Sequence, residues 1–176
     1  MSAISRISTD TPWEPIAGYS RMVRAGEIVA VSGTTATDEH GLIVGAGQMY
    51  VQARQALANI RAALERVGLA MEHVIRTRMF VTDMGRFAEA ARAHKEFFAD
   101  SPPASTIVEV RRLAHPDMMI EIEADAYAGS LSGQRSGSVA ATAAPKPGAQ
   151  ARPKATAKRP AKSAKKPASK KPSRRK

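Results

Sequence analysis

The chain of 176 residues contains no cysteine. Disulfide bonds and thiolate chemistry are therefore excluded. Its four histidines, His40, His73, His94 and His115, are scattered, and no pair has the spacing of a metal-binding motif with a matching carboxylate. Phosphate-binding loops, dinucleotide fingerprints and nucleophile elbows are missing as well. We therefore expect neither a metal nor a cofactor.

Long apolar runs are also missing. No stretch approaches the roughly 20 apolar residues that a membrane-spanning helix needs. The N-terminal segment, MSAISRISTDTPWEP, lacks the apolar centre of a secretory signal peptide. The sequence therefore predicts a cytoplasmic protein that does not associate with membranes.

Acidic residues are absent from residues 130–176, which hold fourteen of the 27 Lys and Arg residues. The first 129 residues carry 13 basic and 16 acidic residues, so the net charge of +11 divides into −3 and +14. A Gly/Ser/Ala-rich stretch leads into a Lys/Ala/Pro tract in which frequent proline opposes a long helix. We expect a folded domain over 1–129 and a disordered basic tail over 130–176.

The tail predicts a polyanion as a partner. Fourteen cations without an anion bind nucleic acid by releasing counterions from the phosphate backbone. The tail has no aromatic residue for stacking on bases, so binding should ignore nucleotide sequence. The alternative is a solubilising tail that binds only weakly. The cations that we assign to nucleic-acid binding are Lys158, Arg159, Lys162, Lys165, Lys166, Lys170, Lys171, Arg174, Arg175 and Lys176.

Hydrophobic periodicity predicts the order β-β-α-β-α-β-β for the folded part. Two short strands over 20–24 and 27–32 flank a turn, and residues 1–15 read as an extended lead-in. Leu57, Ile60, Leu64 and Val67 mark the apolar stripe of a helix over 48–67. A strand over 74–82, a helix over 85–99 and two strands within 104–127 follow. Two helices can cover only one face of such a sheet, so the fold class is α+β.

Alternation along the strands predicts which side chains share the uncovered face. On the last strand Glu121, Glu123 and Asp125 alternate with apolar residues, so these carboxylates lie on one face. Arg76 and Arg78 have the same period on another strand, which favours ion pairing across that face. The side chains predicted to face the helices are Ile75, Thr77, Met79, Val81, Ile120, Ile122, Ala124 and Ala126. The buried side of the second helix is predicted to hold Phe87, Ala90, Ala91, His94, Phe97 and Phe98.

The C-terminal strands carry a family resemblance. Pro103-Ala104-Ser105-Thr106, Val108-Glu109-Val110 and Ile120-Glu121-Ile122-Glu123-Ala124 follow one another at short intervals. This series resembles the signature of the Rid (RidA/YjgF) family, and the resemblance extends over residues 16–129. It implies a chorismate mutase-like fold in which three subunits pack their sheets into a barrel, with sites for small molecules in the clefts between subunits.

The resemblance assigns Glu121 to the glutamate that activates water against an imine carbon. A carboxylate within reach of water can act as a general base, more effectively when burial and neighbouring carboxylates raise its pKa. Glu123 and Asp125 are those neighbours. The alternative interpretation is a charged barrel interior without catalysis.

The resemblance also assigns substrate-binding residues. Ser32 and Gly33 match the Ser-Gly pair that lines the family's cleft, and Tyr19 matches its aromatic residue. Ser105 stands where the family has a carboxylate-binding Arg, and Ile107 is assigned to the same cleft. Without the resemblance to the Rid family, we would interpret Gly33 as an ordinary glycine at the end of a strand and Tyr19 as a packing residue.

The replacement at Ser105 places this chain in a subgroup that lacks the family Arg. Two parallel charge-assisted bonds from an Arg to a carboxylate cannot be replaced by one hydroxyl. The substrate is therefore expected not to be a simple 2-imino acid. A ligand without that carboxylate, binding without turnover, and recruitment of Arg111 or Arg78 remain as alternatives.

Three hypotheses of function follow. The first is hydrolytic deamination of enamines, imines or related reactive metabolites by water activated at Glu121. The second is a non-catalytic trimer that binds a small ligand for regulation. The third adds a nucleic-acid tether through the basic tails. Ribonuclease activity has also been described in the family, but no residue pattern here supports a phosphodiester mechanism.

Overall fold

Six strands form one mixed sheet in the order β1-β2-β3-β6-β4-β5. A computed structural model describes residues 4–9, 11 and 13–130. The strands are β1 (Ile4–Ile7), β2 (Met22–Ala25), β3 (Ile28–Thr34), β4 (Val74–Val81), β5 (Ala104–Glu109) and β6 (Ile120–Tyr127). The helices are α1 (Trp13–Ala17), α2 (Met49–Glu65) and α3 (Phe87–Phe98), with one 3-10 turn before β4 (Met71–His73) and one before α3 (Met84–Arg86).

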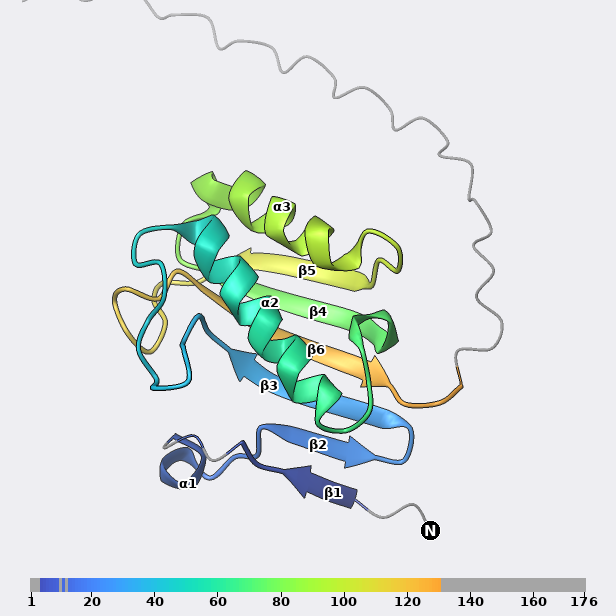
Figure 1. Cartoon of the computed structure of the whole chain (residues 1–176). Helices are drawn as coiled ribbons and strands as arrows, with labels where there is room; N and C mark the ends of the chain where they lie inside the picture. The colour runs from blue at the N-terminus through green and yellow to red at the C-terminus, as the bar shows by residue number, and fades with distance from the viewer. Residues whose placement is uncertain (1–3, 10, 12, 131–176) are drawn as a thin grey trace, which may run out of the picture. The chain divides into compact units, whose positions relative to one another are not determined.

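The two long helices lie across one face of this sheet (Figure 1), as the sequence predicts. Neighbouring strands run antiparallel except β4 and β5, which are parallel and are connected through α3. Within the part of the chain that the structure describes, no helix covers the other face, which we call the open face. The predicted α+β fold is confirmed. The same part of the chain contains no helix of the length and hydropathy that a membrane span requires.

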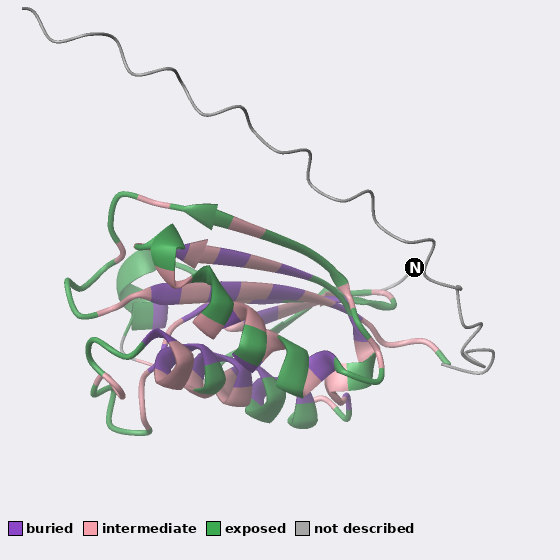
Figure 2. Cartoon of the chain, turned by 90° about the horizontal axis from the view of Figure 1, so that it is seen from above, coloured by how far each residue is buried: buried purple, intermediate pink, exposed green. Residues whose placement is uncertain are grey.

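Local sequence explains where the central elements turn. Gly26 adopts a positive φ of 63° in the β2–β3 hairpin, a conformation that costs glycine little. Gly68, with φ 73°, follows the end of α2. The predicted stripe of α2 is buried, and Leu57, Ile60 and Leu64 have no exposed surface. Buried and exposed segments alternate along the strands and around the helices in Figure 2.

A buried glutamine joins α2 to two loops. The Gln52 side chain has no exposed surface, and its amide nitrogen donates to the carbonyl oxygens of Gly45 (3.2 Å) and Asp117 (2.7 Å). Its amide oxygen accepts from the backbone N–H of Met119 at 2.8 Å. These bonds satisfy polar groups that would otherwise be costly to bury, and they fix the loop that precedes β6.

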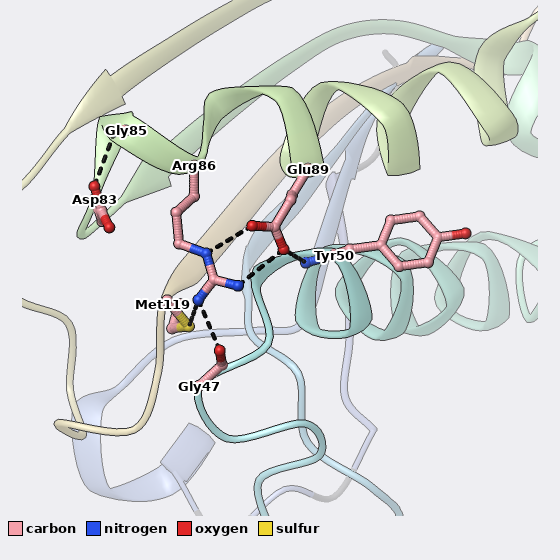
Figure 3. Close-up of polar contacts among 7 residues, drawn as sticks. All are labelled: Gly47, Tyr50, Asp83, Gly85, Arg86, Glu89 and Met119. Atoms are coloured by element: carbon pink, nitrogen blue, oxygen red, sulfur yellow. Dashed lines mark hydrogen bonds and ion pairs between the residues drawn. The ribbon is translucent and has the colours of Figure 1, made fainter.

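Arg86 joins the same loops to the start of α3 (Figure 3). Its guanidinium forms a two-fold ion pair with Glu89 (2.7 and 2.9 Å) and donates to the Gly47 carbonyl oxygen at 2.7 Å. It also approaches the Met119 sulfur at 3.7 Å. The Glu89 carboxylate in turn accepts the backbone N–H of Tyr50 in the first turn of α2. The Arg86 side chain thus ties α2, α3 and the approach to β6 together.

The prediction of an extended lead-in over residues 1–15 missed a strand pairing and a short helix. Residues 4–7 form β1, which pairs with β2 at the edge of the sheet, and residues 13–17 form α1. Hydrophobic periodicity did not predict these two elements because their segment is polar and hydrogen bonds stabilise it. The Glu14 side chain is 5% exposed, and its carboxylate accepts bonds from the Ser8 hydroxyl, the Thr11 hydroxyl and both the amide and hydroxyl of Thr9.

Two other predictions of burial were wrong. Ile75 is 48% exposed, because a bulge adds one residue to β4 between Val74 and Arg76 and breaks the alternation. Phe87 is 48% exposed because it begins α3 outside the packed stripe, whereas Ala93 is fully buried in that helix. The remaining alternation on β4 and β6 agrees with the prediction.

Candidate functional site

Charged side chains from β4 and β6 gather on the open face. The Arg78 guanidinium lies 3.5 Å from the Glu123 carboxylate and 3.3 Å from that of Asp125. Arg76 lies 3.9 Å from Asp125. The predicted pairing across this face is therefore confirmed. Because Arg78 is engaged by two carboxylates, it is a poor substitute for the family Arg.

Glu121 stands apart from these pairs and lies against Gly33. A Cβ atom added to Gly33 would fall 2.0 Å from the Glu121 Oε1 atom, so a larger residue here would displace this carboxylate from its observed position. Burial, and next the negative charge of Glu123, raise the pKa of Glu121 above its ordinary value. No hydrogen-bond partner for the Glu121 carboxylate is found among the described residues, yet neither oxygen is sealed from solvent. The carboxylate can therefore accept a proton from a water molecule.

A bulge in β3 creates this close approach. Between Val31 and Thr34, β3 uses one residue more than β6 uses between Ala124 and Ile122. Ser32 and Gly33 are the residues of the bulge. The Ser32 hydroxyl donates to the carbonyl oxygen of Ser20 at 2.7 Å, which ties the bulge to the residue after Tyr19.

Tyr19 and Arg21 complete this end of the sheet. The Ser32 backbone N–H donates to the Arg21 carbonyl oxygen at 3.0 Å, which extends the β2–β3 ladder by one step. Tyr19 is 37% exposed. The structure thus brings the predicted residues Tyr19, Ser32, Gly33 and Glu121 to one end of β2, β3 and β6, and it adds Arg21 to them.

Ser105 lies elsewhere. It is exposed on the edge strand β5, where its register partner on β4 is Thr77. Thr77 is fully buried, donates its hydroxyl to the Ser105 oxygen at 2.9 Å and contacts the His94 Nε2 atom at 2.9 Å. Burial lowers the pKa of His94 below its ordinary value.

One chain does not bring Ser105 and Glu121 together. Thr77, the partner of Ser105, also pairs with Ala124 on the helix-covered side, whereas Glu121 pairs with Phe80 on the open face. Ile107 follows the orientation of Ser105 and packs partly against the core. The predicted site residues therefore form two groups on opposite faces of the sheet.

Other predicted residues carry no assembled site in this structure. Arg111 is exposed in the loop after β5. Residues 4–9, 11 and 13–130 contain no cluster of three His, Cys, Asp or Glu side chains suited to a metal ion. The basic residues assigned to nucleic-acid binding, from Lys158 to Lys176, lie outside the described residues, as does the predicted tail from residue 131 onward.

Two features of this region were not predicted from the sequence. Arg21 precedes Met22, a core residue of β2, so alternation alone could have placed it on the open face. Thr77 and His94 are 17 residues apart, and only the packing of α3 on β4 brings them together. No local sequence pattern predicts that contact.

The chain resembles known proteins over its described part. A family model described as Endoribonuclease L-PSP matches residues 9–128. A RutC family protein of Pyrococcus horikoshii is 37% identical over 121 residues, which cover 69% of this chain and 95% of that protein.

Solved structures agree with this similarity. A Mycobacterium tuberculosis member of the YjgF/YER057c/UK114 family is 37% identical, with a TM-score of 0.64 over 71% of this chain and 99% of that one. A Yersinia pestis protein of the conserved Rid family is 28% identical, with a TM-score of 0.65 over 71% of this chain and 99% of that one.

Proposed function

The chain belongs to the Rid family, also named for YjgF, UK114 and RutC, and on that premise we propose that it hydrolyses imines or enamines of small reactive metabolites. The observation that carries the proposal is the Glu121 carboxylate. It is half-buried, its pKa is raised, and it is open to water beside a glycine that leaves space for it. Those are the properties of a general base.

The chemistry needs no group beyond water and this carboxylate. Ionised Glu121 removes a proton from water as the water oxygen forms a bond to the imine carbon and the C=N π electrons move to nitrogen. Protonated Glu121 then returns a proton to that nitrogen. A proton then moves from the hydroxyl of the carbinolamine to its nitrogen. The C=O bond forms as the C–N bond breaks, and ammonia leaves with the electrons of that bond.

We propose that the active unit is a trimer with its sites between subunits. The open face exposes charged side chains together with the apolar Ile28 and Val108, which are 44% and 42% exposed. A second copy would cover this face and could bring its own Ser105 edge toward Glu121. The separation of Ser105 from Glu121 within one chain supports this arrangement.

A second candidate is a trimer that binds a small ligand without turnover and is tethered to nucleic acid by its tails. The observation that favours it is Ser105, because the loss of the family Arg removes a substrate anchor. The matching family model is named for an endoribonuclease. Among the described residues the histidines have separate partners, so no pair of them is arranged for general acid–base cleavage of RNA.

Substitution of Ser105 tests the proposal. We expect the unmodified protein to hydrolyse 2-iminopropionate slowly, and Ser105→Arg to accelerate this reaction by about tenfold or more, because charge-assisted bonds to a carboxylate are worth about 1.5–3 kcal/mol. The imine is generated by an amino-acid oxidase, and its disappearance is followed with and without the protein. Ser105→Lys is the matched control, since it restores charge without the two-pronged geometry.

Two results would count against it. Fast hydrolysis by the unmodified protein would show that position 105 does not limit this substrate. No hydrolysis of any imine by either form would favour the ligand-binding candidate.

A further inference from the structure

Arg21 is the cation of the candidate site that the proposed mechanism leaves unused. Its side chain is half-buried beside the Tyr19 phenol and the Glu14 carboxylate. Burial lowers the pKa of Arg21, and the attraction of Tyr19 and Glu14 offsets this only in part. A guanidinium held there lacks the full hydration that it would have at the surface, and a bound anion would compensate for that loss.

No group in the described chain satisfies this guanidinium. The Arg21 side chain has neither a hydrogen bond nor an ion pair there, and its nitrogens are not sealed from solvent. The nearby Glu14 carboxylate is already engaged by the Ser8, Thr9 and Thr11 side chains. By contrast, Arg76, Arg78 and Arg86 all contact carboxylates. Within residues 4–9, 11 and 13–130, Arg21 therefore has no bonded counterion, and its guanidinium can bind an anion.

Arg21 lies on the same face of the sheet as Glu121. Arg21 lies opposite Ser32, the first bulge residue, and the second, Gly33, touches Glu121. Because Met22 faces the core, alternation directs Arg21 to the open face, which also carries Glu121. β3 lies between β2, which Arg21 precedes, and β6, which carries Glu121, and neither group contributes to the pKa shift of the other, so the two charged groups are not in contact.

We propose that Arg21 binds an anionic group of the substrate, and that this group is separated by several bonds from the carbon that water attacks beside Glu121. This inference rests on the proposed function and narrows its substrate class. In a 2-imino acid with a short apolar side chain, the only carboxylate is bonded directly to the imine carbon, so it stays with the reacting carbon beside Glu121. A second carboxylate at the end of a three-carbon chain can extend away from that carbon toward Arg21.

Matched imines test the distance. The oxidase products of glutamate and norvaline have the same chain length and differ in a terminal carboxylate. We expect the protein to prefer the glutamate imine, and Arg21→Gln to raise the KM for it by about ten- to a hundredfold while leaving the norvaline imine unchanged. Arg21→Lys should recover part of the preference. Arg24→Gln is the matched control, because Arg24 donates to the Gly26 carbonyl oxygen within the same hairpin.

Binding of glutarate distinguishes the anion site at Arg21 from the hydrolytic function. We expect glutarate to shift the backbone amide resonances of Ser32 and Gly33 in the unmodified protein and in Arg24→Gln, and not in Arg21→Gln. Glutarate binding that depends on Arg21 without hydrolysis of either imine would support the anion site and refute the hydrolytic function. Hydrolysis with a preference that Arg21→Gln and Arg21→Lys leave unaltered would refute the anion site alone. Glutarate binding that is equal in all variants would also overturn it.

Discussion

Glu121→Gln is expected to lower kcat for imine hydrolysis by about a hundredfold or more, because a positioned general base contributes about 10²–10⁴-fold. Glutamine has the same size, so it can occupy the space that Gly33 leaves, but its amide cannot accept the proton from water. Burial and Glu123 both disfavour the charged form of Glu121. Removing that charge should therefore leave the melting temperature unchanged or raise it at neutral pH.

The pH profile identifies the group that acts. Activity requires ionised Glu121, so kcat/KM should fall as the pH is lowered through its raised pKa. Glu123→Gln removes a neighbouring negative charge that helps to raise this pKa. The acidic limb of the profile should then move to lower pH, while the plateau rate is retained. Asp125→Gln is less suitable as a control because Asp125 pairs with both Arg76 and Arg78.

An alternative role for Glu121 would give different results. If its carboxylate only shapes the open face, Glu121→Gln will retain most of the activity. If another group sets the acidic limb, Glu123→Gln will leave that limb in place. Either result would remove the general base from the proposed mechanism.

Loss of the tail is expected to have the other large effect. We propose that residues 130–176 bind duplex DNA through their fourteen cations, whereas residues 1–129 carry a net charge of −3. A protein that makes 6–10 phosphate contacts loses about 10³–10⁵ in affinity between 50 and 200 mM salt. Half of one tail would supply a comparable number of contacts. The full chain should show this steep dependence, and the truncated chain should bind too weakly to measure.

Fluorescence anisotropy with a labelled duplex, titrated at several salt concentrations, measures both quantities. A chain with the same tail residues in scrambled order is the matched control, and it should bind equally well because no base contacts are proposed. Tails presented together on a trimer would raise avidity through effective concentration. Equal affinity of the truncated and full chains, or affinity that does not change with salt, would contradict the tether.

The sequence predicted most of the sheet and only part of the site. Alternation on β6 was sufficient to place Glu121 with Glu123, because one buried face imposes a period of two. Alternation wrongly predicted that Ile75 is buried, and it did not predict the contact of Gly33 with Glu121. Both lie at β-bulges, which change the strand register and have no signature in the hydrophobic pattern. The elements around Glu14 depend on hydrogen bonds among polar side chains, which hydrophobic periodicity does not detect.

Ser105 shows a second limit. The resemblance placed Ser105 and Glu121 in one cleft, and the structure puts them on opposite faces of one sheet. Sequence similarity predicts which residues belong to a site. The assembly determines which subunit supplies each of them. A site shared between subunits reconciles the two observations.

Mixing two inactive variants tests whether the site is shared between subunits. Glu121→Gln removes the base, and Ser105→Trp is expected to obstruct the cleft with a bulky side chain. If each site takes Glu121 from one subunit and Ser105 from another, random mixed assemblies will have about one intact site in four. Unfolding and refolding the two variants together should then restore imine hydrolysis to about that fraction, while each variant refolded alone stays inactive. Mixed assemblies that form and remain inactive would contradict a site shared between subunits.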